Sequence, residues 1–400
     1  MNIKRLCYLL HLWIGLATGI IVFVVSITGA IYLFKDEISS TYQPWKKVEA
    51  RNQPFLQPSK LIEIANTQSH QERPSAITIG EKDEAVWVDY FGEKGQTTIY
   101  LNPYDGKIIH TSHLGTDEFD FYRFIMNGHL YMWFPRTIGK PLVSYGVLLF
   151  FLTLLTGLVI WMPKHITLHL LKKRLAFHRP FKWRRFVYDL HSVLGIYMLL
   201  PIIVVSITGL IFGLDWFSHG IYQLVSGGKQ MEAYTLPPSD SLHIQSKTAS
   251  IDLLQAKILK ESPNAVQYYY ALPADSQESY RVSVVHEKGS YYKQDNLFFD
   301  QYTLKELKGT GPYAGRYKDG TPADKLIHAT LDLHEGIILG WIGKIIMLFA
   351  ALTSASLPIT GFLLWRRKKK QKKPWSQHHA AHRRKLQART QTSATPWWLI

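Results

Sequence analysis

The sequence of 400 residues is poor in cysteine and in charged side chains. Cys7 is its one cysteine, which excludes an intramolecular disulfide and any zinc or iron–sulfur site built from several thiolates. Charged residues make up only 19% of the chain against 46% hydrophobic residues, so a disordered chain is also excluded. The two long polar segments, 35–140 and 215–336, lack a Gly-rich phosphate loop, a nucleophile elbow and an HExxH zinc motif.

Acidic residues are scarcer than basic ones, and the basic residues are unevenly placed. The chain has 46 Lys and Arg against 30 Asp and Glu, a net charge of +16. Such an excess fits either a nucleic-acid-binding protein or a protein at an anionic membrane. Three segments, 1–10, 163–190 and 366–400, together hold 21 basic residues and a single acid. This confinement indicates membrane topology with lipid as a partner, and it argues against a nucleic-acid partner.

Four long uncharged runs accompany the basic segments. Each is as long as the about 20 apolar residues needed to cross a bilayer. A buried core helix is the alternative for one such run, but four runs with Trp and Tyr near their ends favour membrane spans. The first exceeds the ~7–15-residue apolar region of a secretory signal, so it is interpreted as an uncleaved anchor. The predicted spans are 1–34, 141–163, 188–214 and 337–365.

The basic segments also predict the orientation of these spans. By the positive-inside rule, the connector 164–187 and the tail 366–400 are cytoplasmic, as is the N-terminus. The rest of the chain is slightly acidic, and its two long segments, 35–140 and 215–336, are expected on the outer side. We therefore expect a multi-pass membrane protein with both termini in the cytoplasm.

The chain contains an internal duplication. His11, Gly15 and the motif Val-Val-Ser-Ile-Thr-Gly at 24–29 recur 180 residues later as His191, Gly195 and the same motif at 204–209. The second and fourth runs match in the same way, through Gly-Lys at 139–140 and 343–344 and Thr-Gly at 156–157 and 360–361. With one residue of slippage, His129 aligns with His334. The chain thus reads as two tandem units, each a span, an outer domain and a span.

Each outer segment predicts a small α+β domain. A short amphipathic helix comes first, at 59–70 in one segment and 251–260 in the other. Alternating apolar and polar residues then predict four strands in each segment. These strands are expected near 76–79, 85–90, 97–101 and 107–110, and near 266–270, 280–286, 296–300 and 303–308. The predicted fold is therefore a four-helix transmembrane bundle from a tandem duplication, with two small α+β domains outside.

Four of the 17 histidines occupy equivalent positions in the duplication. His11 and His191 open the first and third spans at the inner face, whereas His129 and His334 precede the second and fourth spans at the outer face. A single histidine at a helix end is usually an interfacial or capping residue. Here each face receives two imidazoles, one from each half, which is the axial ligand set of a b-type heme in a helical bundle.

Small residues near the histidines allow two interpretations. Gly15 and Gly195 follow His11 and His191 by four residues, on the same helix face, where they would leave room for a flat macrocycle. Ordinary packing between membrane helices also uses small residues. That second interpretation applies equally to Gly19, Gly29, Gly157, Gly209 and Gly361.

Zinc is the competing metal, but no catalytic-zinc spacing is present. The outer histidines do not form a compact cluster with acids in the sequence; they are His70, His110, His113, His219, His243, His286 and His328. His328 and His334 are six residues apart and would not share a helix face, although His328 stays an alternative ligand at the outer site. The tail histidines, His378, His379 and His382, are expected to be solvated.

The framework of the spans resembles the PepSY-associated transmembrane family, and within it the iron-siderophore reductases of the bacterial inner membrane. The resemblance covers nearly residues 4–368. It is carried by His11-x3-Gly15, His191-x3-Gly195, both Ser-Ile-Thr-Gly motifs, Leu333-His334-Glu335-Gly336, and the Thr-Gly-x3-Trp endings at 156–161 and 360–365. This chain has Gly-His129-Leu-Tyr before its second span, where the family more often has Leu-His and a basic residue.

The resemblance implies two b hemes (heme b), the inner one held by His11 and His191 and the outer one by His129 and His334. It implies PepSY-like periplasmic domains and electron transfer from the cytoplasmic side to a periplasmic ferric siderophore or other ferric chelate, which releases Fe(II). Only a basic tail follows Arg366, without the flavin-binding extension of some relatives. The electron donor is therefore expected in trans, as a quinol or a cytoplasmic flavoprotein.

Two other functions compete with this interpretation. One is a non-enzymatic, membrane-anchored PepSY protein that binds or restrains a periplasmic peptidase or another envelope partner. It explains the outer domains but gives the four membrane histidines no role. The other is a permease for a chelate, which four spans with little charge inside the membrane disfavour.

Overall fold

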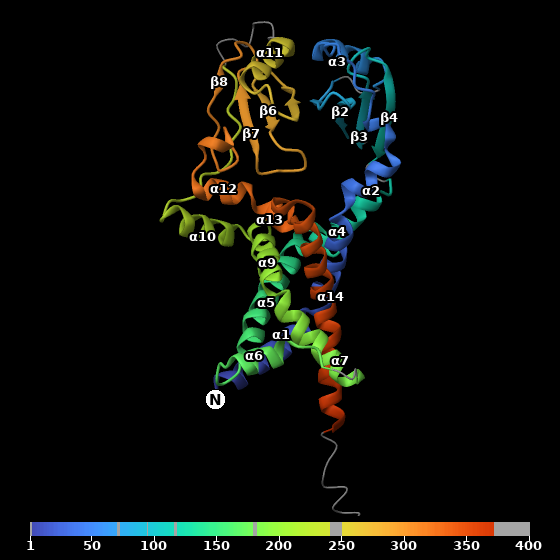
Figure 1. The fold of residues 1–400 in the computed structure, drawn as a ribbon. Coiled ribbons are helices and arrows are strands. Elements are labelled where there is room, and N and C mark those ends of the chain that lie inside the picture. The colour runs from blue at the N-terminus through green and yellow to red at the C-terminus, as the bar shows by residue number, and fades with distance from the viewer. Residues whose placement is uncertain are drawn as a thin grey trace, which may run out of the picture.

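The computed structural model describes residues 2–69, 73–93, 95–115, 118–178, 182–240 and 250–371. Within them, long apolar helices stand at one end of the molecule and a β-sheet at the other (Figure 1). The start of α1 and the last turns of α14 lie far from the sheet (Figure 1). We call the two ends of the helical region the sheet end and the connector end.

Among the described residues, three helical segments are long and apolar enough to cross a membrane. They are α1 (Ile3–Tyr32), α5 (Arg136–Trp161) and Ile337–Arg366, which joins η5 (Ile337–Leu339) to most of α14 (Gly340–Gln371). A fourth span exists if α9 (Leu199–Gly213) and the bent helix before it are counted as one. Both α1 and α9 pack against α5 and α14, so the apolar segments share one interior, where Leu154, Ile202 and Ala350 are buried.

The segment of the third predicted span is not one straight helix. The segment 188–214 is divided among α7 (Trp183–Asp189), the π-helical η2 (Leu190–Leu194), α8 (Gly195–Tyr197) and α9, with a bend of 66° before Leu199. Pro201 in the first turn of α9 has no N–H to donate to the carbonyl four residues earlier, which interrupts the helix there. Hydropathy alone did not predict the bend, because one proline hardly changes the mean hydropathy of an apolar run.

The outer segments form one antiparallel sheet of eight strands, in the order β4-β3-β2-β1-β5-β6-β7-β8. The first half supplies β1 (Ala76–Ile79), β2 (Val86–Gly92), β3 (Gly95–Leu101) and β4 (Ile108–Gly115). The second half supplies β5 (Gln267–Ala271), β6 (Tyr280–Val285), β7 (Gln294–Phe299) and β8 (Glu306–Leu307). The halves meet where β1 pairs with β5, with Ala76 opposite Ala271 and Ile79 opposite Tyr268. The strands match the predicted positions, but the expectation of two separate domains is corrected to one shared sheet.

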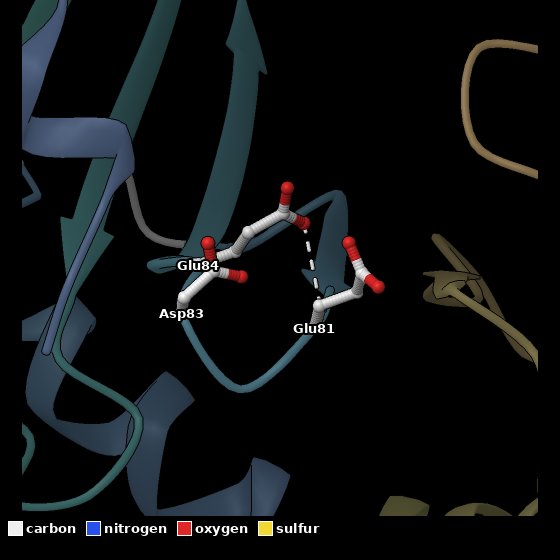
Figure 2. A group of neighbouring side chains, drawn as sticks. All are labelled: Glu81, Asp83 and Glu84. Atoms are coloured by element: carbon white, nitrogen blue, oxygen red, sulfur yellow. Dashed lines mark hydrogen bonds between the residues drawn. The ribbon is translucent and has the colours of Figure 1, made fainter. Parts of the chain in front are cut away.

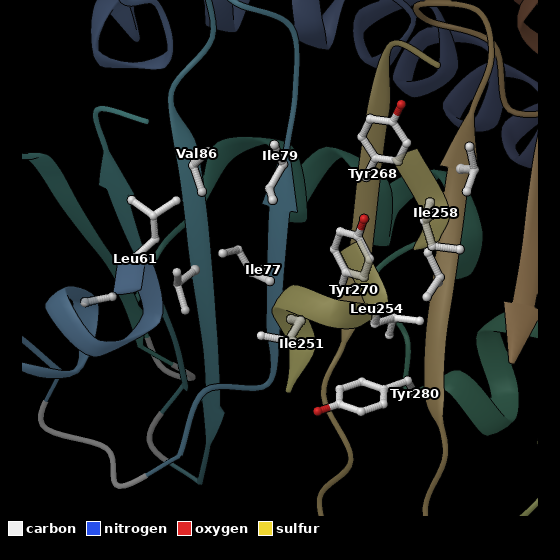
Figure 3. Close-up of a cluster of buried hydrophobic side chains, with 14 of the residues drawn as sticks. Leu61, Ile77, Ile79, Val86, Ile251, Leu254, Ile258, Tyr268, Tyr270 and Tyr280 are labelled. Carbon is white, nitrogen blue, oxygen red and sulfur yellow. The ribbon is translucent and has the colours of Figure 1, made fainter. Parts of the chain in front are cut away.

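One core crosses the boundary between the halves. Helices α3 (Pro58–Asn66) and α11 (Ile251–Glu261) cover the same face of the sheet, and their apolar faces are buried against the strands of both halves (Figure 3). Between the helices, the Ser59 amide and hydroxyl donate to the Asp252 carboxylate at 2.9 and 2.5 Å. Burial of this shared apolar surface therefore holds the two halves together as one unit.

Short helices complete the fold. Between the sheet and the apolar helices lie α2 (Lys35–Tyr42), α4 (Phe121–Tyr131), α10 (Asp215–Ser226), α12 (Pro322–His328) and α13 (Thr330–Glu335), as Figure 1 shows. At the connector end lies α6 (Leu168–Leu175), which has Lys172, Lys173 and Arg174 in its last turn. Two 3-10 turns, η1 (Pro44–Lys46) and η4 (Tyr317–Asp319), lie in the outer loops.

Candidate functional site

The four matched histidines come together as two pairs, one at each end of the apolar helices. His11 of α1 and His191 of η2 have ring centres 6.1 Å apart, with ring planes at 89°. His129 of α4 and His334 of α13 have ring centres 6.1 Å apart, with ring planes at 74°. Each pair combines one histidine from each half of the duplication. We call the pair nearer the connector end the inner pair (His11, His191) and the pair nearer the sheet end the outer pair (His129, His334) (Figure 1).

The separation within each pair fits a metal ion between two imidazoles. An imidazole nitrogen lies about 2 Å from a metal that it ligates, and the ring centre lies roughly 1 Å behind that nitrogen. Two imidazoles on opposite sides of one ion therefore have ring centres about 6 Å apart, as both pairs do. Two imidazoles at this separation in a helical interior could hold a metal centre such as a heme iron, which takes two axial ligands.

The Nδ1 atom of every paired histidine is already hydrogen-bonded. His11 donates to the Thr153 carbonyl and His129 to the Val25 carbonyl, both at 2.9 Å. His191 contacts the Thr360 hydroxyl at 2.9 Å and His334 the Thr208 hydroxyl at 2.8 Å. With the proton held on Nδ1, the lone pair of the other ring nitrogen is free to bind a metal.

Local backbone features place the outer pair. His129 is in the last turn of α4, which ends at Met132 and Trp133 with φ of 51° and 59°. His334 is in the last turn of α13, which ends at Gly336 with φ of 78°. A Cβ at Gly336 would lie 2.5 Å from the Gly343 carbonyl oxygen, so only glycine allows this close turn into α14. Both histidines therefore precede a turn that leads into a long apolar helix; the sequence predicted their place before the helix but not the turn.

Charged residues lie close in the sequence to one histidine of each pair, Glu335 beside His334 and Asp189 two residues before His191. At the sheet end, Lys344 pairs with Glu37 and lies over the ring of Phe34, 5.3 Å from its centre. Burial raises the pKa of the Glu335 carboxyl, next to His334, to about 7, although Lys344 opposes the shift. At the connector end, the fully buried Asp189 carboxylate lies 2.9 Å from Nε of Arg185 and accepts the backbone N–H of His178 at 3.1 Å.

A Cβ placed at either predicted glycine, Gly15 or Gly195, would not meet a histidine. A Cβ at Gly15 would meet nothing within 4 Å, and one at Gly195 would meet only the Leu357 side chain at 3.4 Å. The open space at Gly15 is compatible with the predicted room for a macrocycle, and the role of both glycines stays a prediction.

Four other glycines face the imidazoles directly, a role that the sequence did not predict for them. Each lies in a different apolar helix beside one ring of the two pairs. A Cβ on each would lie close to Cε1 of its neighbour, as for Gly29 with His129 (2.9 Å), Gly157 with His11 (3.0 Å), Gly361 with His191 (3.3 Å) and Gly209 with His334 (3.6 Å). A partial signal is the Thr-Gly dipeptide, which occurs in all four predicted spans but twice in the first, at 18–19 and 28–29.

The alternative outer ligand, His328, lies elsewhere. It is buried in α12 against Tyr313 and Tyr317, whose ring centres are 5.0 and 5.8 Å from its own. Burial lowers the pKa of His328, which keeps the ring neutral. The structure brings His129, and not His328, to His334.

Among the described residues, one group of acids has metal-like spacing, in the loop between β1 and β2 (Figure 2). It consists of Glu81, Asp83 and Glu84. Lys288 lies 2.7 Å from both glutamates, and Lys47 lies 2.6 Å from Asp83. These ion pairs neutralise the acids and link the two halves of the sheet, so the cluster is a surface salt-bridge network.

Several predicted positions lie outside the described residues. They are His70, His243, the tail histidines His378, His379 and His382, Arg179 of the connector, and the tail beyond 371.

Comparison with known proteins places the whole framework in one family. Residues 8–368 match the family model described as the PepSY-associated TM region. No curated protein matches the chain.

Proposed function

Because the chain belongs to the PepSY-associated transmembrane family, we propose that it is a membrane oxidoreductase with two b hemes. The main support for this proposal is the geometry of the two histidine pairs. In each pair the ring centres are 6.1 Å apart, and both Nδ1 atoms are hydrogen-bonded to the protein. His11 and His191 would hold the inner heme, and His129 and His334 the outer heme. A bound heme supplies reversible one-electron chemistry.

The placement of the pairs supports electron transfer across the membrane. One pair lies at each end of apolar helices that are long enough to span a bilayer. The apolar interior between them excludes water, and the protein residues orient the four imidazoles. We propose that electrons enter at the connector end and leave at the sheet end.

The substrate that we propose is a periplasmic ferric siderophore or another ferric chelate. Hard oxygen donors hold Fe(III) more tightly than Fe(II), so reduction by one electron loosens the iron and releases it as Fe(II). The donor is proposed to act in trans from the cytoplasmic side, as a quinol or a flavoprotein.

The proposed location is the bacterial inner membrane, with both termini in the cytoplasm. Its support is the charge distribution, because 21 basic residues and one acid lie in three short segments. The described parts of these segments lie at the connector end, which includes α6 and the start of α1 (Figure 1).

Optical spectra of the purified protein test the heme proposal. We expect a dithionite-reduced b-type α band and two hemes per chain by pyridine hemochrome assay. The double variant His11→Ala with His191→Ala should retain one heme, and the further changes His129→Ala and His334→Ala should remove it. His219→Ala is the control, because His219 is exposed on α10 and its Nδ1 bonds only within that helix, to Asp215.

Two results would contradict the proposal: a wild-type protein without the α band, or an unchanged band in the four-histidine variant. A stable heme-free protein would instead favour the membrane-anchored PepSY protein that binds an envelope partner. For the substrate, purified protein in liposomes with a reduced quinol should reduce a ferric chelate, and a coloured Fe(II)-specific ligand records the product.

A further inference from the structure

We propose that four Thr-Gly pairs are positioning sites that fix the orientation and the proton of the four imidazoles. The pairs are Thr28-Gly29 in α1, Thr156-Gly157 in α5, Thr208-Gly209 in α9 and Thr360-Gly361 in α14, and we call each a Thr-Gly socket. The inference rests on the proposed function, because it assigns the residues that prepare the histidines for an iron ion.

The glycine of each socket provides the space for the ring. A Cβ on any of the four would lie 2.9 to 3.6 Å from Cε1 of an imidazole. At Gly29 and Gly157 this distance is at or below 3.0 Å, so a methyl group would displace the ring. The absent side chain therefore lets each imidazole lie against the backbone of the neighbouring helix.

In two sockets the close approach brings Nδ1 to a backbone carbonyl. His129 bonds to Val25 and His11 to Thr153, residues that precede the socket glycine by four positions. In the other two sockets, Nδ1 of His334 and of His191 bonds to the hydroxyl of the socket threonine. All four Nδ1 atoms thus have a partner in the helix turn that carries their Thr-Gly pair.

The threonine hydroxyl of each socket is a hydrogen-bond donor to its own helix. All four donate back to carbonyls of their own helix, and the bonds to the residue four before are Thr28 to Val24 (2.7 Å), Thr156 to Leu152 (3.1 Å), Thr208 to Val204 (2.8 Å) and Thr360 to Ser356 (2.9 Å). A hydroxyl that has donated its proton can only accept from an imidazole. Thr208 and Thr360 therefore receive the Nδ1 protons of His334 and His191 at 2.8 and 2.9 Å.

Each half of the duplication builds its own sockets, whereas each histidine pair joins the two halves. His11 and His129 enter sockets on α5 and α1 of the first half, and His191 and His334 enter sockets on α14 and α9 of the second half. Each ring is thus oriented by its own half, whereas its partner in the pair belongs to the other half. An acceptor at Nδ1 also makes the ligating nitrogen more basic, which favours Fe(III) over Fe(II).

Ordinary helix packing is the rival explanation for these glycines, and α5 contains a matched control. Gly157 and Gly146 both lie on α5 and face α1. A Cβ at Gly157 would lie 3.0 Å from His11, and one at Gly146 would lie 2.9 Å from Ile21. The two alanine substitutions crowd the same helix pair equally, but only one displaces an imidazole.

The first experiment compares Gly157→Ala with Gly146→Ala in the full-length protein purified with heme. We expect Gly157→Ala to convert one of two hemes from low-spin to high-spin, or to lose it, in optical and EPR spectra. Gly146→Ala should keep both hemes low-spin, even if its melting temperature falls. If the two substitutions change the spectra equally, or if Gly157→Ala leaves them unchanged, the proposal that the sockets position the imidazoles is wrong.

The second experiment removes one hydroxyl and measures the midpoint potential of the inner heme. Thr360→Val keeps the shape of the side chain but loses the acceptor for His191, so the potential should rise, by about 59 mV if the preference for Fe(III) falls tenfold. Thr360→Ser should restore the wild-type potential. A Thr360→Val potential equal to that of wild type would refute the role of the hydroxyl.

The two proposals fail in different ways. Wild-type protein without heme overturns the proposed function and the sockets together. If wild-type protein binds two hemes but the socket substitutions change neither the spectra nor the midpoint potentials, only the role of the sockets is contradicted.

Discussion

Two tyrosines of β5 show how one hydroxyl group decides whether a buried side chain stabilises the sheet. Tyr268 donates its hydroxyl to the Ser262 carbonyl at 2.6 Å. Tyr270 is fully buried in the same core, and no hydrogen-bond partner of its hydroxyl lies among the described residues. An unsatisfied buried hydroxyl costs about 1–3 kcal/mol, whereas a satisfied one contributes about 1 kcal/mol.

We therefore predict opposite effects for two identical substitutions. Tyr270→Phe should raise the free energy of unfolding by about 1 kcal/mol, and Tyr268→Phe should lower it by a similar amount. Thermal unfolding of the full-length protein in detergent, followed by intrinsic fluorescence, measures both. A melting temperature that falls equally in the two variants would show that the Tyr270 hydroxyl has a partner.

Asp89 predicts a pH dependence of stability. Burial raises the pKa of this carboxyl above its ordinary 3.8, although it accepts hydrogen bonds from Thr98 (2.7 Å) and Gln96 (3.1 Å). A raised pKa in the folded state means that stability falls as pH rises from 3.8 through the shifted pKa, and the loss persists above it. Asp89→Asn should therefore stabilise the protein at pH 7, with a gain that shrinks toward pH 4.

Melting temperatures of wild type and Asp89→Asn at several pH values test this sign. Asp105 provides a control of opposite sign, because a backbone hydrogen bond and the ion pair with Arg51 lower the pKa of its carboxyl. Asp105→Asn should slightly destabilise the protein at pH 7. A gain for Asp89→Asn that does not change with pH would point to packing and not to charge.

At the residue scale, the sequence predicted the four histidines but not what holds them. A polar residue that recurs at matched positions of a duplication stands out, so His11, His129, His191 and His334 could be found. The socket glycines could not be separated from packing glycines with certainty, because Thr-Gly also occurs at 18–19, where the glycine packs against a proline. Only the three-dimensional structure shows that Gly157 faces a ring and Gly146 an isoleucine.

At the scale of elements, the pairing of β1 with β5 is the feature that the sequence did not predict. Each strand was expected, since alternation of apolar and polar residues marks it. Alternation does not show which strand lies next to which. The partners here are separated by nearly 200 residues, so the choice depends on tertiary contacts such as those of α3 with α11.

A cross-link tests this pairing. Ala76 and Ala271 lie opposite each other, next to the hydrogen-bonded neighbours Ser75 and Leu272. Opposed residues at such positions have Cα atoms about 4.5 Å apart, within the range of a disulfide. In a Cys7→Ser background, Ala76→Cys with Ala271→Cys should form an oxidised cross-link, seen by mass spectrometry after proteolysis.

The control replaces one partner with a residue on the edge strand. Thr111 lies on β4, and β3, β2 and β1 separate it from β5. Thr111→Cys with Ala271→Cys should give no intramolecular cross-link. Two independent domains would leave the Ala76 and Ala271 pair equally unlinked, which contradicts the shared sheet.

At the scale of the whole molecule, the basic segments predict which end faces the cytoplasm. Lys107 is exposed on the sheet side and Lys173 is exposed on α6 at the connector end. In a Cys7→Ser background, a membrane-impermeant maleimide should label Lys107→Cys in spheroplasts. Lys173→Cys should react only after the membrane is permeabilised. Labelling of both in intact spheroplasts would contradict the orientation.

The sequence predicted much of the overall architecture, because run lengths, hydropathy and the internal duplication can be read along the whole chain. The helical membrane region and the strand segments followed from run lengths and periodicity. The bend before Leu199 did not, because it depends on one proline and on packing against α14. The union of the outer segments depends on contacts between distant parts of the chain, which no local pattern encodes.

The two halves of the chain are arranged like the two subunits of an isologous dimer. They share one sheet, and each histidine pair takes one residue from each half. Each half holds its own two rings, yet neither half can complete a pair alone. Two separate half-length copies would reach this state only at a concentration set by their affinity. The connector 164–187 replaces that dependence with a high effective concentration, so assembly no longer varies with the abundance of the protein. Because the halves belong to one chain, their sequences need not be identical. Paired positions such as Ile77 and Tyr270 already carry different residues.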